Sequence, residues 1–323
     1  MAAHRETPVG DTQDPRAVPG AWLVALRLLR WAREHWLLPI MLLAAAVRFF
    51  DLTAAAIWFD EGSSVLLSQF PLAEIWGLAA HDVHPPLYFL LLHGWIGLFG
   101  DGILSIRLMS ALPGIITVGL GVWLVDLLAT RRAALLAGLL LALLPTAVRY
   151  SQEVRMYSLL GMWLIGATIA LVYWVRQPRR HRYLVAYALL MTAAFYTHYF
   201  TVLCVISHWL YLTAVRVQPG YRLRHIQRPA WWLANLSIAL LYMPWVPNLL
   251  DLLQHIPELK ASNDIGWEDP VTLSSLPSMV WSLLIQDDGM TLPGWLFLLL
   301  PLALVAVIAV ALHRDRSVFR GSL

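Results

Sequence analysis

The chain has 323 residues, of which 59% are hydrophobic and only 13% carry a charged side chain. A soluble domain carries about 25% charged residues, so this composition excludes a soluble protein, and several apolar runs are long enough to cross a bilayer as helices. The net charge of +3 gives no strongly basic surface for nucleic acid. With Cys204 as its single cysteine, the chain can form no internal disulfide bond and no thiolate metal cluster.

The amino-terminal segment, residues 1–35, is predicted to be cytosolic. It begins with a polar tail that has no apolar stretch of the kind found in signal peptides. The sequence "AWLVALRLLRWAR", residues 21–33, then places Arg27, Arg30 and Arg33 at helical spacing. This pattern predicts a basic amphipathic helix that lies on the inner leaflet.

The predicted fold class is all-α, a polytopic helical membrane protein with about eight transmembrane helices. The apolar stretches that would form them are 36–50, 105–128, 132–148, 156–175, 183–199, 200–215, 231–250 and 293–312. Residues 251–323 would then comprise an outer loop, the final transmembrane helix and a cytosolic tail.

One further apolar stretch, 85–99, is predicted to lie in the plane of the membrane. If it does not cross, all but five of the 23 Lys and Arg side chains lie at the cytosolic face. If it did cross, the segments "RQPRRHR" and "RLRHIQR" would face outward, against the positive-inside rule. The chain therefore has one long outer loop, 51–104, with residues 149–157, 196–200 and 251–292 on the same outer face.

Two adjacent acids, Asp60 and Glu61, follow the first span in "WFDEGSS". Acids directly after a membrane span are either solvated loop residues that mark the membrane interface or functional groups. Desolvation near lipid raises the pKa of a carboxylate and makes it a better base. Both acids are therefore candidate catalytic residues.

The stretch "HDVHPPLYF", residues 81–89, combines two histidines, an acid and two prolines. The prolines are typical of a helix start, and this alone explains the motif if His84 is an ordinary interfacial residue. His84 is otherwise placed at the mouth of the in-plane helix as a substrate-binding candidate. Together with His81 and Asp82 it could also hold a divalent metal ion.

The second outer loop, "RYSQEVRMY", carries Arg149, Glu153, Arg155 and Tyr157. Arg149 and Glu153 at i, i+4 spacing can form a simple surface ion pair. A guanidinium also matches phosphate oxygens, and arginines are scarce on this face. The sequence therefore predicts a phosphate-binding role for at least one of the outer arginines, a set completed by Arg48 and Arg107.

The turn "YTHYF", residues 196–200, adds His198 as a weaker candidate, since tyrosine and histidine are also typical of an interfacial belt. The chain has no glycine-rich nucleotide loop, no H-E-x-x-H metalloprotease motif and no G-x-S-x-G hydrolase elbow. These absences disfavour nucleotide, metalloprotease and serine hydrolase chemistry.

In their order and spacing these motifs resemble the GT-C superfamily of membrane glycosyltransferases. The similarity covers about residues 36 to 215 and is greatest to the bacterial RgtA/B/C/D-like branch, which is related to protein O-mannosyltransferases and aminoarabinose transferases. Aminoarabinose transferases carry a lysine where this chain has His84, so their particular substrate is not implied.

The resemblance implies a catalytic transmembrane module at 36–250 in a bacterial cytoplasmic membrane, with its active site on the outer face. It implies transfer of a sugar, with inversion, from a polyprenyl-phosphate donor to a glycan, lipid or protein acceptor, without a cofactor. It maps the catalytic acid onto Asp60, with Glu61 beside it. Substrate-binding roles fall to His84, Arg107, Arg149, Glu153, Arg155, Tyr157 and His198.

Two alternatives remain open at this point. A transporter or flippase of lipid-linked sugars would use the same outer acids and arginines for binding alone. A non-catalytic, truncated relative is the other alternative, because the carboxyl-terminal half is short for the resemblance.

Overall fold

The computed structural model describes residues 36–214, 224–261, 272–285, 293, 298–299, 301–306 and 309–310. All regular secondary structure in these residues is helical, which confirms the all-α prediction. The predicted amphipathic helix at 21–33 lies outside the described residues, as does much of the predicted last span, 293–312.

Three described helical segments are long and apolar enough to cross a membrane. They are α6 (Ile103–Leu128), α9 (Tyr157–Arg176) and the segment Pro229–His255. The last consists of α12 (Pro229–Tyr242), a single 3-10 turn and the first part of α13 (Val246–Ala261). Shorter apolar helices occupy three other predicted spans, namely α2 (Leu37–Phe49), α10 (Arg182–Phe195) and α11 (Thr201–Ala214).

The predicted span at 132–148 is not one straight helix. It consists of α7 (Arg131–Leu143) and α8 (Pro145–Gln152), which meet at 53°. The break lies at Leu144, whose φ of −59° and ψ of 116° are not helical. Proline disfavours the helical conformation in the residue before it, so Pro145 ends α7 and begins α8.

The long first loop contains more structure than expected. The helix predicted at 85–99 is confirmed as α5 (Leu87–Phe99), which begins after the double proline and ends before Gly100 at a φ of 80°. Two short helices that the apolar pattern did not reveal precede it, α3 (Phe59–Ser68) and α4 (Leu72–Ala79). Both are too short to register as spans, so the apolar pattern contains no separate signal for them.

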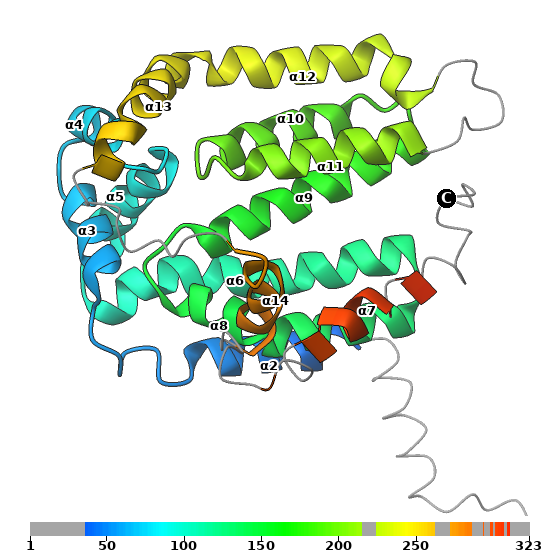
Figure 1. The fold of residues 1–323 in the computed structure, drawn as a ribbon, viewed down its shortest axis with the longest axis horizontal. Helices are drawn as coiled ribbons and strands as arrows, with labels where there is room; N and C mark the ends of the chain where they lie inside the picture. Colours follow the sequence, from blue (N-terminus) through cyan, green and yellow to red (C-terminus); the bar gives the residue numbers. More distant parts are fainter. Residues whose placement is uncertain are drawn as a thin grey trace, which may run out of the picture. The chain divides into compact units, whose positions relative to one another are not determined.

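The helices α6, α9, α10, α11 and α12 run alongside one another (Figure 1). α6 and α9 run in the same direction, because α7 makes the return between them, and from α9 to α12 the direction alternates. Their connections therefore gather at two ends. The end that carries α3, α4 and α5 also carries the α10–α11 turn, because the Leu87 N–H donates to the Tyr196 carbonyl at 2.9 Å. It also carries the start of α13, because Trp76 of α4 packs edge-on against Trp245 with ring centroids 5.0 Å apart. The predicted meeting of these loops on one face is thus confirmed.

Two clusters of buried apolar side chains hold this arrangement. One lies among α9, α10, α11 and α12 around Trp174, Tyr187 and Trp231. The other lies under the loop helices α4 and α5, where Tyr88 and Phe89 pack with residues of α6 and α9 and with Trp245. The second cluster supports the end at which the sequence motifs meet.

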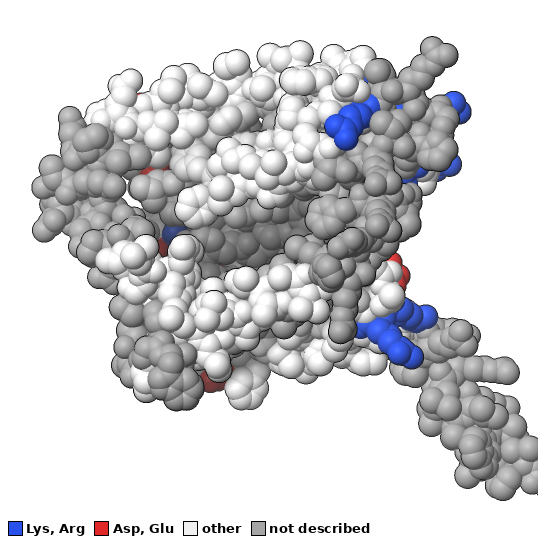
Figure 2. Space-filling model, turned by 45° about the vertical axis from the view of Figure 1, so that its right-hand side comes forward, with Lys and Arg blue, Asp and Glu red and all other residues white. Residues whose placement is uncertain are grey.

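Many large apolar side chains remain exposed on the helices, including α7, α10, α11 and α12. Figure 2 shows that the described charged side chains on one face gather towards its two sides, with uncharged residues between them. A bilayer would solvate such an apolar band, whereas water would not. The chain is an integral membrane protein.

A further helix, α14 (Ser275–Ile285), lies against α8, where the Thr146 hydroxyl donates to the Leu283 carbonyl at 2.7 Å. Part of the predicted 251–292 loop therefore reaches the same end as the other loops. The rest of that loop includes residues outside the described ranges.

Candidate active site

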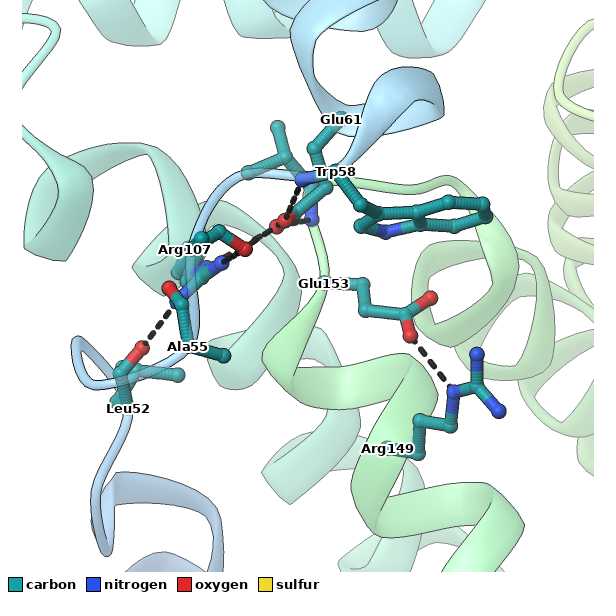
Figure 3. Close-up of polar contacts among 9 residues, drawn as sticks. Leu52, Ala55, Trp58, Glu61, Arg107, Arg149 and Glu153 are labelled. Carbon is teal, nitrogen blue, oxygen red and sulfur yellow. Dashed lines mark hydrogen bonds and ion pairs between the residues drawn. The ribbon is translucent and has the colours of Figure 1, made fainter. Parts of the chain in front are cut away.

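Glu61 is fully buried at the start of α3 and connects three parts of the chain. Arg107 of α6 donates to it twice, from Nη2 to Oε2 at 2.8 Å and from Nε to Oε1 at 3.0 Å (Figure 3). Oε1 also accepts from the Val154 N–H at 2.9 Å, and Oε2 from the Trp58 N–H at 3.4 Å. Both oxygens are used within the chain, so the geometry gives Glu61 a positioning role rather than contact with a substrate.

Arg107 is equally enclosed, with 2% of its surface exposed. Besides Glu61, it donates from Nη1 to the carbonyls of Leu52 and Ala55, both at 2.9 Å, and from Nη2 to that of Ala56 at 3.2 Å. A guanidinium has five N–H donors, and these contacts use all of them. Arg107 therefore fixes the loop before α3, and no donor remains for the substrate-binding role predicted for it.

A tight turn between α8 and α9 separates two of the predicted site residues. The Arg155 N–H donates to the Glu153 carbonyl at 2.8 Å, which closes a three-residue γ-turn around Val154. The Val154 N–H is the group that Glu61 accepts. Glu153 lies on one side of this turn beside Arg149, and Arg155 lies on the other beside Asp60.

Arg155 is buried but incompletely satisfied. Its Nη1 donates to the Ser64 hydroxyl at 3.2 Å and to the Asp60 carbonyl at 3.4 Å, and its Nη2 lies 3.6 Å from Asp60 Oδ2. All three distances are long for charge-assisted contacts. Its Nε is buried and has no hydrogen-bond partner among the described residues. A buried cation with an unused donor and only long contacts is suited to receiving an anion.

Asp60, unlike its neighbour, keeps about a third (35%) of its side chain exposed. Its backbone carbonyl accepts from the Ser64 hydroxyl at 2.8 Å, which helps to fix the first turn of α3. The ion pair with Arg155 is the side-chain contact that the described residues provide for its carboxylate. Adjacent acids therefore have opposite surroundings, one sealed inside the fold and one open.

His84 reaches the same guanidinium from the α5 side. Its Nδ1 lies 2.9 Å from Asp82 Oδ1, and its Nε2 lies 3.4 Å from Arg155 Nη2. Since the carboxylate can only accept, Nδ1 carries the proton, and Nε2 is left as an acceptor towards Arg155. Asp82 also accepts from the His84 backbone N–H at 2.9 Å, in an Asx turn that fixes the ring.

His198 lies beside His84 in the α10–α11 turn, with the two ring centroids 5.3 Å apart. Its Nδ1 accepts from the Phe200 N–H at 3.1 Å, so its proton lies on Nε2. Burial lowers the pKa of His198 to about 4, with smaller contributions from His84 and Arg155. Tyr157 completes the group, since its ring centroid is 5.9 Å from that of His198 and 5.8 Å from the Arg155 guanidinium carbon.

Arg149 and Glu153 form an ion pair at 2.8 Å, with 55% of the arginine side chain exposed (Figure 3). They line a cavity of about 460 Å³ together with Trp58, Asp51 and the Glu61–Arg107 pair. The cavity lining does not include Asp60, His84 or Arg155. The predicted site residues thus form two groups. Each contains a charged side chain with one buried atom that has no hydrogen-bond partner among the described residues, Glu153 Oε2 in the cavity group and Arg155 Nε in the other, but only the second is a cation.

Arg48 belongs to neither group. Its guanidinium donates to the Ser151 hydroxyl at 3.2 Å and to the carbonyls of Ala142 and Leu141 at 3.2 and 3.1 Å. Gly114 of α6 packs directly against this Arg48–Ser151 contact, since a Cβ there would collide with Ser151 Oγ and would lie 3.2 Å from Arg48 Nε. Arg48 therefore joins α2 to the α7–α8 break and is not placed to meet a ligand.

Two residues of the site have roles that were not predicted from the sequence, since Ser64 was not considered and Asp82 was considered only as a possible metal ligand. Ser64 supplies a hydroxyl to Arg155, and Asp82 fixes His84. Both had a signal, because Ser64 stands four residues after Asp60 in a helical register and Asp82 stands two residues before His84.

The described residues contain no group of three or more His, Cys, Asp or Glu side chains arranged to hold a metal ion. In the metal site suggested by "HDVHPPLYF", His81 turns away, because its Nδ1 lies 3.0 Å from the Gly77 carbonyl. Asp82 and His84 bind each other instead, and His84 contacts Arg155.

Comparison with known proteins identifies the chain by its sequence. Residues 83–247 match the family described as dolichyl-phosphate-mannose-protein mannosyltransferase. The match covers half of the chain and includes His84, Arg155 and His198, while Asp60 and Glu61 precede it. No curated protein and no solved structure matches the chain. The chain therefore belongs to the dolichyl-phosphate-mannose-protein mannosyltransferase family, and it is a membrane glycosyltransferase of the GT-C type.

Proposed function

We propose that the chain transfers a sugar from a polyprenyl-phosphate donor to an acceptor hydroxyl at the outer face of the membrane, with inversion and with Asp60 as the general base. The observation that carries this proposal is the pairing of an open carboxylate, Asp60, with a buried guanidinium, Arg155, that has an unused donor. One group is suited to taking a proton and the other to holding a phosphate.

The phosphate role is assigned to Arg155. A lipid-linked sugar presents a phosphodiester at the membrane surface, and this becomes a phosphate monoester as the sugar leaves. Arg155 can direct Nε and one Nη towards two phosphate oxygens, the geometry in which guanidinium binds phosphate best. The charge that develops on the leaving oxygen would then meet a preorganised cation in a partly desolvated site.

The base role is assigned to Asp60. The acceptor oxygen attacks the anomeric carbon, the bond from that carbon to the phosphate oxygen breaks, and polyprenyl phosphate leaves with the bonding electrons. The acceptor proton passes to Asp60. A single displacement needs one base and no nucleophilic carboxylate, which agrees with one open acid beside one sealed acid.

Glu61 and Arg107 are assigned a supporting role. Glu61 holds the first turn of α3, which carries Asp60, and through the Val154 N–H it holds the turn that carries Arg155. The distance between base and phosphate-binding group thus depends on one buried ion pair. Arg149 and Glu153, which line the cavity, are assigned to the acceptor side.

The proposal is tested by turnover in native lipid. Purified protein in vesicles made from membranes of its source cells is given radiolabelled polyprenyl-phosphate mannose, and then other polyprenyl-phosphate sugars. We expect the label to leave the lipid donor with one of them, and turnover to fall by about 10²–10⁴-fold in Asp60→Asn, which retains the size of the side chain but cannot accept the proton.

The matched control is Asp101→Asn, an exposed acid between α5 and α6 that belongs to neither group of site residues. It should keep most of the turnover. An Asp60→Asn protein that inserts, folds and reacts at the parent rate would remove Asp60 from the mechanism. If every donor survives intact with the parent protein, the transferase proposal itself fails.

A further inference from the structure

Arg155 has an unused donor for a phosphate, but the net charge of the side chains around it does not favour an incoming anion. Asp60 lies 3.6 Å from the guanidinium, and Asp82 is connected to it through His84. With both imidazoles neutral, two carboxylates therefore face one guanidinium, and the group is negative before any phosphate arrives. The ion pairs Glu61–Arg107 and Arg149–Glu153 are balanced and change nothing. A phosphodiester would add a second excess negative charge, so its binding needs one more positive charge.

His84 is the group placed to supply that charge. Its Nε2 points at Arg155 Nη2 across 3.4 Å, so this nitrogen lies where a phosphate oxygen held by Arg155 would come. Its Nδ1–H is already held by Asp82 at 2.9 Å. A carboxylate that holds one imidazole nitrogen stabilises the imidazolium when the other takes a proton.

The titratable and charged groups that face His84 come from four elements. They are Asp82 in its own turn, Asp60 of α3, Arg155 of the γ-turn, and His198 with Tyr199 in the α10–α11 turn. In the free protein, the Nη2–H of Arg155 points at Nε2 of His84, so Arg155 opposes the binding of a proton to this nitrogen. A bound phosphate would neutralise Arg155 and accept the new N–H, so the opposition is removed at the moment of binding.

We propose that His84 takes up a proton from water when the donor phosphate binds, and that Nε2 then donates to this phosphate. This inference rests on the proposed function, because it concerns the same donor site. In this proposal His84 is a phosphate ligand whose charge depends on pH, and Asp82 is the residue that positions it. The donor should therefore bind less tightly as the pH rises.

His198 is the other imidazole of the group, and it is not the acceptor of this proton. Its Nδ1 is engaged by the Phe200 N–H, and burial keeps its pKa at about 4. It remains neutral through the range in which an ordinary histidine titrates, between about pH 5 and 8. It can offer its Nε2–H as a neutral donor.

The experiment measures proton uptake on binding, without turnover. The full-length protein in detergent is titrated with farnesyl methyl phosphate, a phosphodiester that has no transferable sugar and whose charge is constant in this pH range. Calorimetry in two buffers of different ionisation enthalpy gives the number of protons taken up. We expect an uptake of up to one proton per ligand, and the affinity to fall by up to about tenfold per pH unit where uptake is complete.

Three variants locate the proton. His84→Gln keeps an acceptor for Arg155 but cannot be protonated, so uptake should vanish and the affinity should become independent of pH. Asp82→Asn keeps the oxygen of the Asx turn but lacks the charge that stabilises imidazolium, so uptake should decrease. His81→Gln, three residues away and bonded to Gly77 instead, should behave as the parent.

The possible failures are distinguishable. Binding that is lost in Arg155→Ala but takes up no proton in the parent would overturn this inference and leave the proposed function standing. Uptake that persists in His84→Gln would assign the proton elsewhere and would also overturn it. Absence of binding at every pH would overturn both the donor class and this inference.

Discussion

Replacement of Glu61 by glutamine should destabilise the protein strongly, although the change removes only a charge. Arg107 would remain 2% exposed with no counter-ion, and the amide can offer one oxygen where the carboxylate offers two to Arg107, Val154 and Trp58. Removal of one partner from a buried ion pair costs about 3–5 kcal/mol. We therefore expect a loss of this size in the free energy of unfolding.

The adjacent acid provides the matched control. Asp60→Asn changes the same functional group one residue away, but its side chain is 35% exposed and its ion pair is long. A long, partly exposed ion pair of this kind contributes about 0–1 kcal/mol, well below the loss expected for Glu61→Gln. The two variants should separate two properties, because Glu61→Gln loses stability and Asp60→Asn loses turnover while keeping stability.

Thermal unfolding in detergent, followed by the fluorescence of a thiol-reactive dye on Cys204, compares the parent with both variants. A loss of 3–5 kcal/mol corresponds to a decrease in Tm on the order of 10 °C. Equal Tm values for Glu61→Gln and Asp60→Asn would refute the reasoning, because they would show that Arg107 finds another partner or stays solvated. A large decrease for Asp60→Asn would show that its carboxylate is structural.

Four other outcomes are expected. Single cysteines at Ser63 and Ser317, in a Cys204→Ala background, test the topology with an impermeant maleimide on intact spheroplasts. We expect labelling at Ser63 but not at Ser317. The reverse pattern would be incompatible with a site on the outer face. Arg155→Ala should raise the donor KM by at least tenfold, which corresponds to about 1.5–3 kcal/mol for charge-assisted hydrogen bonds, and Arg155→Lys should restore only part of it because lysine lacks the fork. The pKa of His198 is about 4 in the folded protein and about 6.5 in the unfolded chain. As the pH falls from about 6.5 to about 4, the unfolded chain therefore takes up the proton first, and the parent should lose more stability than His198→Gln. Chemical denaturation at several pH values would measure this difference. EDTA should leave turnover nearly unchanged, whereas a metal-dependent mechanism would lose activity and regain it with a divalent ion.

The membrane architecture could be predicted from the sequence because two independent patterns agreed. Long apolar stretches marked the helices, and the bias of arginine in loops such as 176–182 determined which connections share an end. The position of α5 followed from Pro85 and Pro86. These features are local, so a single sequence contains them.

The parts that could not be predicted depend on distant partners. The sequence places Glu61 and Arg107 forty-six positions apart, and no local pattern indicates that each satisfies the other. For the same reason Arg48 and Arg107 were counted among the outer arginines that could bind phosphate, although both are held by partners within the chain, Arg48 by Ser151 and backbone carbonyls and Arg107 by Glu61 and backbone carbonyls. The break at Pro145 was missed for another reason, because apolar composition continues unchanged through it.

The start of α5 bears on how much water the outer surface of the protein must hold. Four backbone donors at the beginning of a helix have no partner within it, and in most helices water satisfies some of them. In α5, Pro86 brings no N–H at all, and Leu87 gives its own to Tyr196. Half of the usual demand for hydration is therefore met before any solvent is bound. A helix that begins in this way can lie at the depth of the lipid headgroups with few ordered waters, and each alanine placed at a proline of this motif would bring back one donor that must be hydrated.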